Sequence, residues 1–193
     1  MQKLVRGYRG KLADLADISQ PFQVRMKTVG NAVYDTCCFG VDDTGKLSDD
    51  RYMIFYNQPN SPGGEITMDT NGQEYSYTVD VSRLPASIAR LVFTVSVDGT
   101  QTMQEIQSHT VSITQNGNVC AELELSGGDF NRERAIIGLE IYLKTVWRVC
   151  ATASGFDGGL SDLLKAYGGE SLDEPEEPEE PKVQPQAAPE QPL

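Results

Sequence analysis

Nucleophilic and metal chemistry in proteins often uses histidine, and this chain has only one, His109. A single histidine cannot build a metal site that needs two or more, and a histidine-activated nucleophile would depend on this residue alone. His109 lies in a strand-like run, 107–113, which predicts a structural or surface role. The chain also has no Gly-x-Ser-x-Gly elbow, P-loop or Gly-x-Gly-x-x-Gly motif. We therefore expect a protein that is not an enzyme.

The four cysteines are the other reactive side chains, and none has a Cys-x-x-Cys neighbour: Cys37, Cys38, Cys120 and Cys150. This spacing gives no argument for zinc or for a thioredoxin-like redox pair. In a reducing compartment the simplest expectation is four free thiols. Cys37 and Cys38 are adjacent, so on a strand their side chains point to opposite faces and cannot form one site. Cys120 is expected to face outward.

The net charge of −12 limits the classes of partner. An acidic protein is repelled by phosphate backbones, so we expect no nucleic acid unless the fold hides a basic face. Divalent cations or basic protein surfaces suit the charge better. No stretch approaches the roughly 20 apolar residues of a membrane span, and the N-terminus lacks the apolar run of a secretion signal. These features predict a cytoplasmic protein.

Alternating apolar residues predict strands with one buried face and one wet face. The clearest runs are 75–81, 91–97, 119–125 and 135–143, with a short bulky run at 52–56. Turn pairs such as Asn71-Gly72 and Asn116-Gly117 separate these runs. Many short strands joined by such turns predict an all-β fold, a β-sandwich of two mainly antiparallel sheets.

The segment 159–168 departs from this pattern and predicts a short helix. Ser161 is expected to cap its start and Gly168 to close its last turn. Its apolar residues fall at helical spacing and are expected to pack on the sandwich: Leu160, Leu163, Leu164 and Tyr167.

The C-terminal composition predicts a disordered acidic tail. Residues 171–193 hold seven acids and one lysine, half of the net charge, and many prolines. Such a sequence cannot bury enough apolar surface to offset the entropy of ordering. We expect a folded domain at 1–170 and a disordered Pro/Glu-rich tail at 171–193. The tail is either a solubilising appendage or linker, or a docking segment for a partner.

Three blocks carry a resemblance to a known family. The first runs from Tyr34-Asp35 through 41–50 to 52–64, the second is 77–95, and the third runs from 136 to 168. In order and spacing they resemble the TerD-like family of bacterial tellurite-resistance and stress-response proteins. Within that family the chain resembles a divergent member of the TerA type. The resemblance implies a β-sandwich and, for some members, calcium binding by acidic loops at one end.

The calcium motif is only partly matched by this chain. Asp35 matches the first acid of the family's Asp-x-Asp, but the second position is Cys37, a soft thiol that suits calcium poorly. A shortened central loop supplies further oxygens, from Asp69, Asn71 and Glu74, with Asp42, Asp43 and Asp98 expected nearby. A calcium site at Asp35, Asp69, Asn71 and Glu74 therefore stays one alternative, and a chain without calcium the other.

Three hypotheses of function follow. The first is a non-enzymatic binding or scaffold module that acts in tellurite resistance or general stress response through other proteins of those responses. The second is a calcium-dependent sensor in which the loop cluster fills before a partner docks. The third is direct thiol chemistry with tellurite, for which an exposed Cys120 is the best candidate because reaction requires an accessible thiolate.

Overall fold

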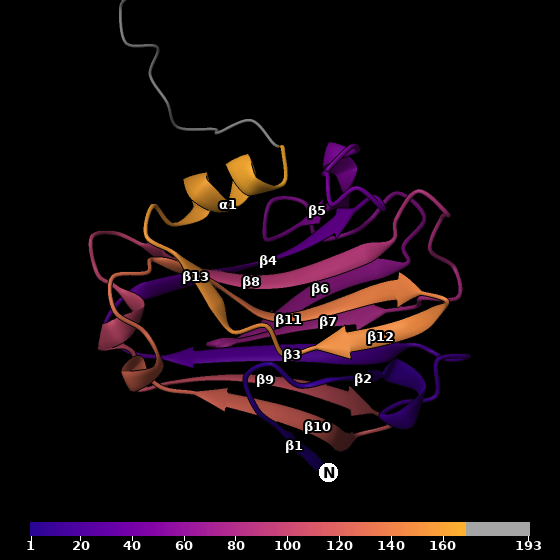
Figure 1. Cartoon of the computed structure of the whole chain (residues 1–193), viewed down its shortest axis with the longest axis horizontal. Helices are drawn as coiled ribbons and strands as arrows, with labels where there is room; N and C mark the ends of the chain where they lie inside the picture. The colour runs from indigo at the N-terminus through magenta and orange to yellow at the C-terminus, as the bar shows by residue number, and fades with distance from the viewer. Residues whose placement is uncertain (169–193) are drawn as a thin grey trace, which may run out of the picture.

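The computed structural model describes residues 1–168, which fold into two β-sheets stacked face to face (Figure 1). This confirms the predicted all-β sandwich with one short helix near the C-terminus. The predicted tail, 171–193, lies outside the described residues. None of the helices within residues 1–168 has the length and apolar character needed to cross a membrane.

The first sheet has six strands in the order β1-β10-β9-β3-β7-β6. They are β1 (Gln2–Leu4), β3 (Phe22–Val29), β6 (Ile66–Asn71), β7 (Glu74–Val79), β9 (Ser108–Gln115) and β10 (Asn118–Leu125). All neighbouring strands are antiparallel except β1 and β10, which run parallel.

The second sheet has seven strands, with the order β2-β12-β11-β8-β4-β5 and β13 paired to β11. They are β2 (Arg9–Lys11), β4 (Val33–Val41), β5 (Met53–Ile54), β8 (Arg90–Asp98), β11 (Ala135–Lys144), β12 (Val146–Cys150) and β13 (Ser154–Phe156). The other elements of residues 1–168 are η1 (Leu12–Asp14), η2 (Asp50–Tyr52), η3 (Met103–Glu105), η4 (Gly127–Asp129) and α1 (Leu160–Ala166).

The main core lies between the sheets. Its largest fully buried side chains include Phe22, Met26, Tyr77 and Phe93. Tyr77 of the first sheet and Phe93 of the second meet edge to face, with ring centroids 5.7 Å apart. Such aromatic pairs add specific geometry to the large area that they bury. The alternation in 75–81 and 91–97 therefore correctly identifies which residues face the other sheet.

A second core lies on the outer face of the second sheet, because α1 packs there (Figure 1). Leu163 and Leu164 of the helix lie against Phe39 and Val92 of the sheet. Strand β8 is consequently buried on both faces along most of its length. The expectation that 91–97 has one wet face is therefore wrong in this part of the sheet.

The start of α1 also differs from the prediction. The helix begins at Leu160, so Ser161 lies inside the first turn, and the N-cap residue is Gly159, which makes no side-chain cap hydrogen bond. Gly159 has φ of +70°, a left-handed conformation that costs glycine little. Leu160 is 36% exposed rather than buried in the core. The end of the helix follows the prediction, since the Gly168 N–H donates to the carbonyl of Lys165.

Candidate functional site

A cleft of about 430 Å³ opens where α1 crosses the ends of β4 and β8. The loop after β5 forms one wall and the start of α1 forms another. The lining side chains that define its chemistry are Asp35, Phe55, Tyr56, Asn57, Asp98, Arg134 and Leu160. The sequence alone did not indicate this cleft, because it exists only when the helix docks on the sheet.

Two carboxylates lie together on the floor of the cleft. Asp35 pairs in register with Ser96, and Asp98 pairs with Val33, so both acids occupy neighbouring positions on adjacent strands. Both face outward, as Cys37 does two residues along β4. Partial burial and then repulsion from Asp98 raise the pKa of the Asp35 carboxyl. Neither acid makes an ion pair within residues 1–168, so the pair attracts a cation or a proton.

Arg134 is the cationic side chain on the edge of the same cleft. Its guanidinium donates through Nη2 to the backbone carbonyl of Gly99. Its Nε is buried and has no hydrogen-bond partner in the described part of the chain. A buried donor without a partner carries a desolvation cost. The cleft therefore presents two acceptor carboxylates, and the unpartnered Arg134 Nε lies beneath its surface.

The aromatic wall of the cleft comes from the turn at 55–58. Phe55 and Gln58 pair through two backbone hydrogen bonds of 3.1 and 2.9 Å. The Gln58 side-chain amide also donates to the carbonyls of Asp50 and Met53, at 2.8 Å each. These bonds hold the turn so that Tyr56 stays 62% exposed. The Phe55-Tyr56-Asn57-Gln58 motif is thus a rigid turn that presents an aromatic ring to solvent.

The four predicted metal ligands are not brought together. Asp35 faces outward from the second sheet, whereas Asp69 and Asn71 of β6 are exposed on the outer face of the first sheet. Glu74 lies beside them and pairs with Arg25 at 3.6 Å. The alternation of the strands explains the separation, because the neighbours of these residues face the core between the sheets.

A cation site would need another arrangement of ligands. No three histidine, cysteine, aspartate or glutamate side chains within residues 1–168 gather closely enough to hold a metal ion. Of the three acids expected nearby, Asp98 does lie beside Asp35. Asp42 instead closes its own turn by accepting from Thr44 and from the backbone of Lys46. Calcium binding stays a prediction, and the cleft pair is the better place to test it.

All four cysteines are free thiols. Cys37, Cys38 and Cys150 are buried, and Cys120 is partly exposed on β10. Burial raises the pKa of the Cys37 and Cys38 thiols, which disfavours the reactive thiolate. Direct thiol chemistry by Cys120 stays a hypothesis.

His109 has the structural setting that its strand context predicts. It is fully buried between the sheets, and its Nδ1 lies 2.8 Å from the Thr28 hydroxyl. A Cβ at Gly138 of the facing strand β11 would lie 3.3 Å from its Nε2, so the glycine makes room for the ring. Desolvation lowers the pKa of His109 to about 4, which keeps the imidazole neutral near pH 7.

The fold makes this chain a two-sheet β-sandwich protein in which α1 covers the outer face of one sheet. Residues 3–167 match the TerD domain. The chain therefore belongs to the TerD domain family, which confirms the resemblance seen in the sequence.

Two relatives and one solved structure illustrate the family. The tellurium resistance protein TerA of Alcaligenes sp is 35% identical over 127 residues, which cover 64% of this chain and 36% of TerA. This chain thus spans little more than a third of that relative. The chemical-damaging agent resistance protein B of Clostridium acetobutylicum is 30% identical over 135 residues, 63% of this chain and 97% of the relative. A crystal structure of a TerD homologue from Streptomyces coelicolor A3(2) superposes with a TM-score of 0.57 at 19% identity, over 76% of this chain and 94% of that one.

Proposed function

We propose that this chain is a non-enzymatic binding module in resistance to tellurium or a related chemical stress, and that it works by docking a protein partner in the cleft beside α1. The names of its relatives support the biological setting. The observation that carries the docking site is an exposed tyrosine, Tyr56, on a rigid turn above the unpaired acids Asp35 and Asp98. Exposed aromatic side chains on fixed backbone are typical anchors of protein interfaces.

The chemistry of the cleft defines the segment that it would accept. Phe55, Tyr56 and Leu160 offer apolar contact, while Asp35 and Asp98 offer two negative charges. A segment with an apolar side chain next to a lysine or arginine fits both features. Such a cation would replace the repulsion within the acid pair by attraction, and this gain is largest where water is partly excluded.

The test uses the full chain in a host whose own copy is deleted. Tyr56→Ala should abolish tellurite resistance while the protein accumulates and keeps its melting temperature, because the exposed ring contributes little to the fold. Val119→Ala removes an exposed apolar side chain from the first sheet and serves as the matched control. A photo-reactive residue at position 56 should cross-link to one defined protein, and the same residue at position 119 should not. Full resistance of Tyr56→Ala would contradict the proposal.

The acid pair supports a second candidate, calcium binding that precedes docking. Asp35 and Asp98 supply two carboxylates and Asn57 an amide, all lining the cleft. Calcium takes six to eight oxygens, so this set fits it only in part and backbone carbonyls or water must supply the others. Partial burial and then the neighbouring Asp98 raise the pKa of Asp35, and a bound cation would oppose both effects.

Calorimetric titration of calcium into the metal-stripped full chain separates the alternatives. A ligand that binds only the folded state also raises the melting temperature. Loss of binding in Asp98→Asn but not in Asp69→Asn would assign calcium to the cleft. Loss in Asp69→Asn alone would assign it to the loop cluster expected from the sequence. An absence of both heat and thermal shift would leave the module to act without calcium.

A further inference from the structure

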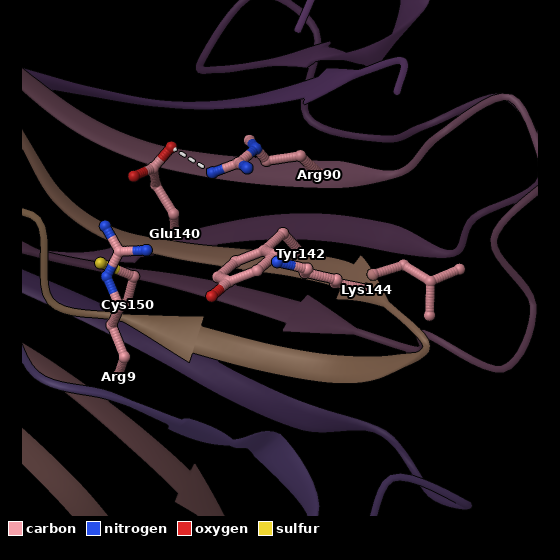
Figure 2. Close-up of a pocket in the computed structure, with 7 residues that line it drawn as sticks. Arg9, Arg90, Glu140, Tyr142, Lys144 and Cys150 are labelled. Atoms are coloured by element: carbon pink, nitrogen blue, oxygen red, sulfur yellow. Dashed lines mark hydrogen bonds and ion pairs between the residues drawn. The ribbon is translucent and has the colours of Figure 1, made fainter. Parts of the chain in front are cut away.

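The outer face of the second sheet is basic on the side away from the cleft. Arg9 and Lys11 of β2, Lys144 of β11 and Arg148 of β12 surround the ring of Tyr142. We call these four cationic residues the basic face. The register explains the cluster, since Lys11 lies directly opposite Arg148, which in turn lies opposite Tyr142. Figure 2 shows Arg9 and Lys144 on either side of the tyrosine ring.

The charges of the basic face are not neutralised within residues 1–168. Glu140 is the acid that lines the adjoining hollow, and it already pairs with Arg90 at 3.0 Å (Figure 2). Glu140 also accepts a hydrogen bond from the Thr152 hydroxyl. None of the four cations of the basic face makes an ion pair in the described structure. Like charges placed directly opposite each other on neighbouring strands repel, as Lys11 and Arg148 do here.

Two hollows on either side of Tyr142 give an anion room to approach. One measures about 320 Å³ and the other about 510 Å³, and both are lined by Arg9 and Lys144. An anionic group in either hollow would contact cations from two or three strands at once. The net charge of −12 for the whole chain gives no indication of this local basic surface.

The chain itself contains a segment of opposite charge that starts on the same outer face of the second sheet. Residues 169–193 hold eight acids and one lysine. They follow α1, whose last residues lie on the outer face of the second sheet, where the Tyr167 ring stacks on Phe39 with centroids 5.6 Å apart. Val41, on the same face of β4, pairs in register with Arg90. A Cβ at Gly168, the last described residue, would lie 3.2 Å from the Lys46 side chain, in the turn that follows this strand.

The distance to the basic face is within reach of a short stretch of chain. From β4 to β2 there are four strand spacings, or about 19 Å. Glu174 follows Gly168 by six residues, which span up to about 20 Å when extended. The acids from 174 to 180 can therefore all be placed over the basic face.

We propose that the acidic segment 170–180 binds the basic face of the same chain and shields it from other polyanions. The opposite charges, the start of the segment on the same face of the sheet and its reach carry this inference, which is independent of the docking cleft. The proposal also assigns a role to this segment. Its composition is compatible both with a solubilising appendage and with a docking segment.

Carbodiimide coupling of the full chain, followed by peptide mass spectrometry, tests the proposal because it joins lysine amines to nearby carboxylates without a spacer. The monomer band should contain links from Lys11 or Lys144 to the acids at 174–180, and few such links to Lys27, an exposed lysine of the first sheet. Arg148→Glu combined with Arg9→Glu should lower the yield on the order of tenfold, since both changes replace attraction by repulsion. Lys27→Glu is the matched control. Raising salt to 1 M should lower the yield of the unchanged chain as well.

Three results would overturn the proposal. Links confined to a dimer band would mean that the segment binds a second copy. An equal yield at Lys27 and at the basic face would mean contact without preference. Binding of a short duplex DNA by the unchanged chain, lost in the Arg148→Glu and Arg9→Glu variant and without any link to the segment, would assign the basic face to nucleic acid.

Discussion

Acidification should destabilise this protein through His109. The imidazole is fully buried, and its Nε2 has no hydrogen-bond partner in the described structure. Desolvation holds its pKa at about 4, compared with 6.5 for an unperturbed histidine. Between pH 4 and pH 6.5, His109 is protonated in the unfolded chain and neutral in the folded chain. Folding stability is therefore complete above pH 6.5 and falls as the pH is lowered towards 4.

The two pKa values set the size of the effect. From linkage, His109 should cost about 2 kcal/mol of folding free energy at pH 5 and about 3 kcal/mol at pH 4, relative to pH 7.5. A domain of this kind has a total stability of about 5–15 kcal/mol, so the loss is easily measured. Below pH 4 the folded imidazole also becomes protonated, and this contribution stops growing.

Urea unfolding followed by the fluorescence of Trp147, the one tryptophan of the chain, measures the effect. The unchanged protein is compared with His109→Gln, which keeps a polar side chain but cannot titrate. The carboxylates affect both proteins alike, so the difference between their pH profiles isolates His109. The unchanged protein should lose about 3 kcal/mol more than the variant between pH 7.5 and pH 4. Parallel profiles would refute the assignment of a neutral, desolvated imidazole.

Two further predictions concern the core between the sheets. Gly138→Ala should cost about 1–3 kcal/mol and lower the melting temperature, because the new Cβ would lie 2.8 Å from Val111 Cγ2; an unchanged melting temperature would show that the strand can shift at no cost. Tyr77→Phe should cost about 1–3 kcal/mol in urea unfolding, because it leaves the buried Thr36 hydroxyl without its 2.9 Å partner. Adding Thr36→Val should recover part of that loss, and a strictly additive double variant would contradict this account.

Much of the fold could be predicted because the alternation of apolar and polar residues along a strand indicates which side chains are buried. Phe93 and Val95 face the other sheet as their spacing predicts. The same pattern failed for Val92, which α1 covers from the other side. The prediction of a wet face assumed a surface open to water, and a helix that arrives about 70 residues later in the chain removes it. Local patterns do not record such long-range covering.

The candidate site was harder to predict, because its parts come from five separate segments of the chain. The family motif indicates Asp35, whereas the sequence indicates its partner Asp98 only as an acid expected nearby. The sequence places Asp69 and Asp35 in one calcium site, yet the two side chains lie on opposite outer faces of the sandwich. The alternation of 66–71 and 34–39 contained this information, since Met68 and Thr36 are the inward residues of their strands. Comparing the two alternations would have separated the pair before the structure was known.

The outer face of the second sheet carries both proposed interactions, and this arrangement couples them. The acids Asp35 and Asp98 lie at one end and the basic face at the other, with α1 packed between them. A partner segment that enters the acidic cleft must carry positive charge, which an uncovered basic face would repel. Charges separated by more than about 10 Å interact weakly at 0.1 M salt, so this repulsion acts mainly on approach. If the acidic segment covers the basic face, that barrier is removed. Replacing the acids at 174–180 by glutamine should therefore slow the association of such a partner more than it speeds the dissociation.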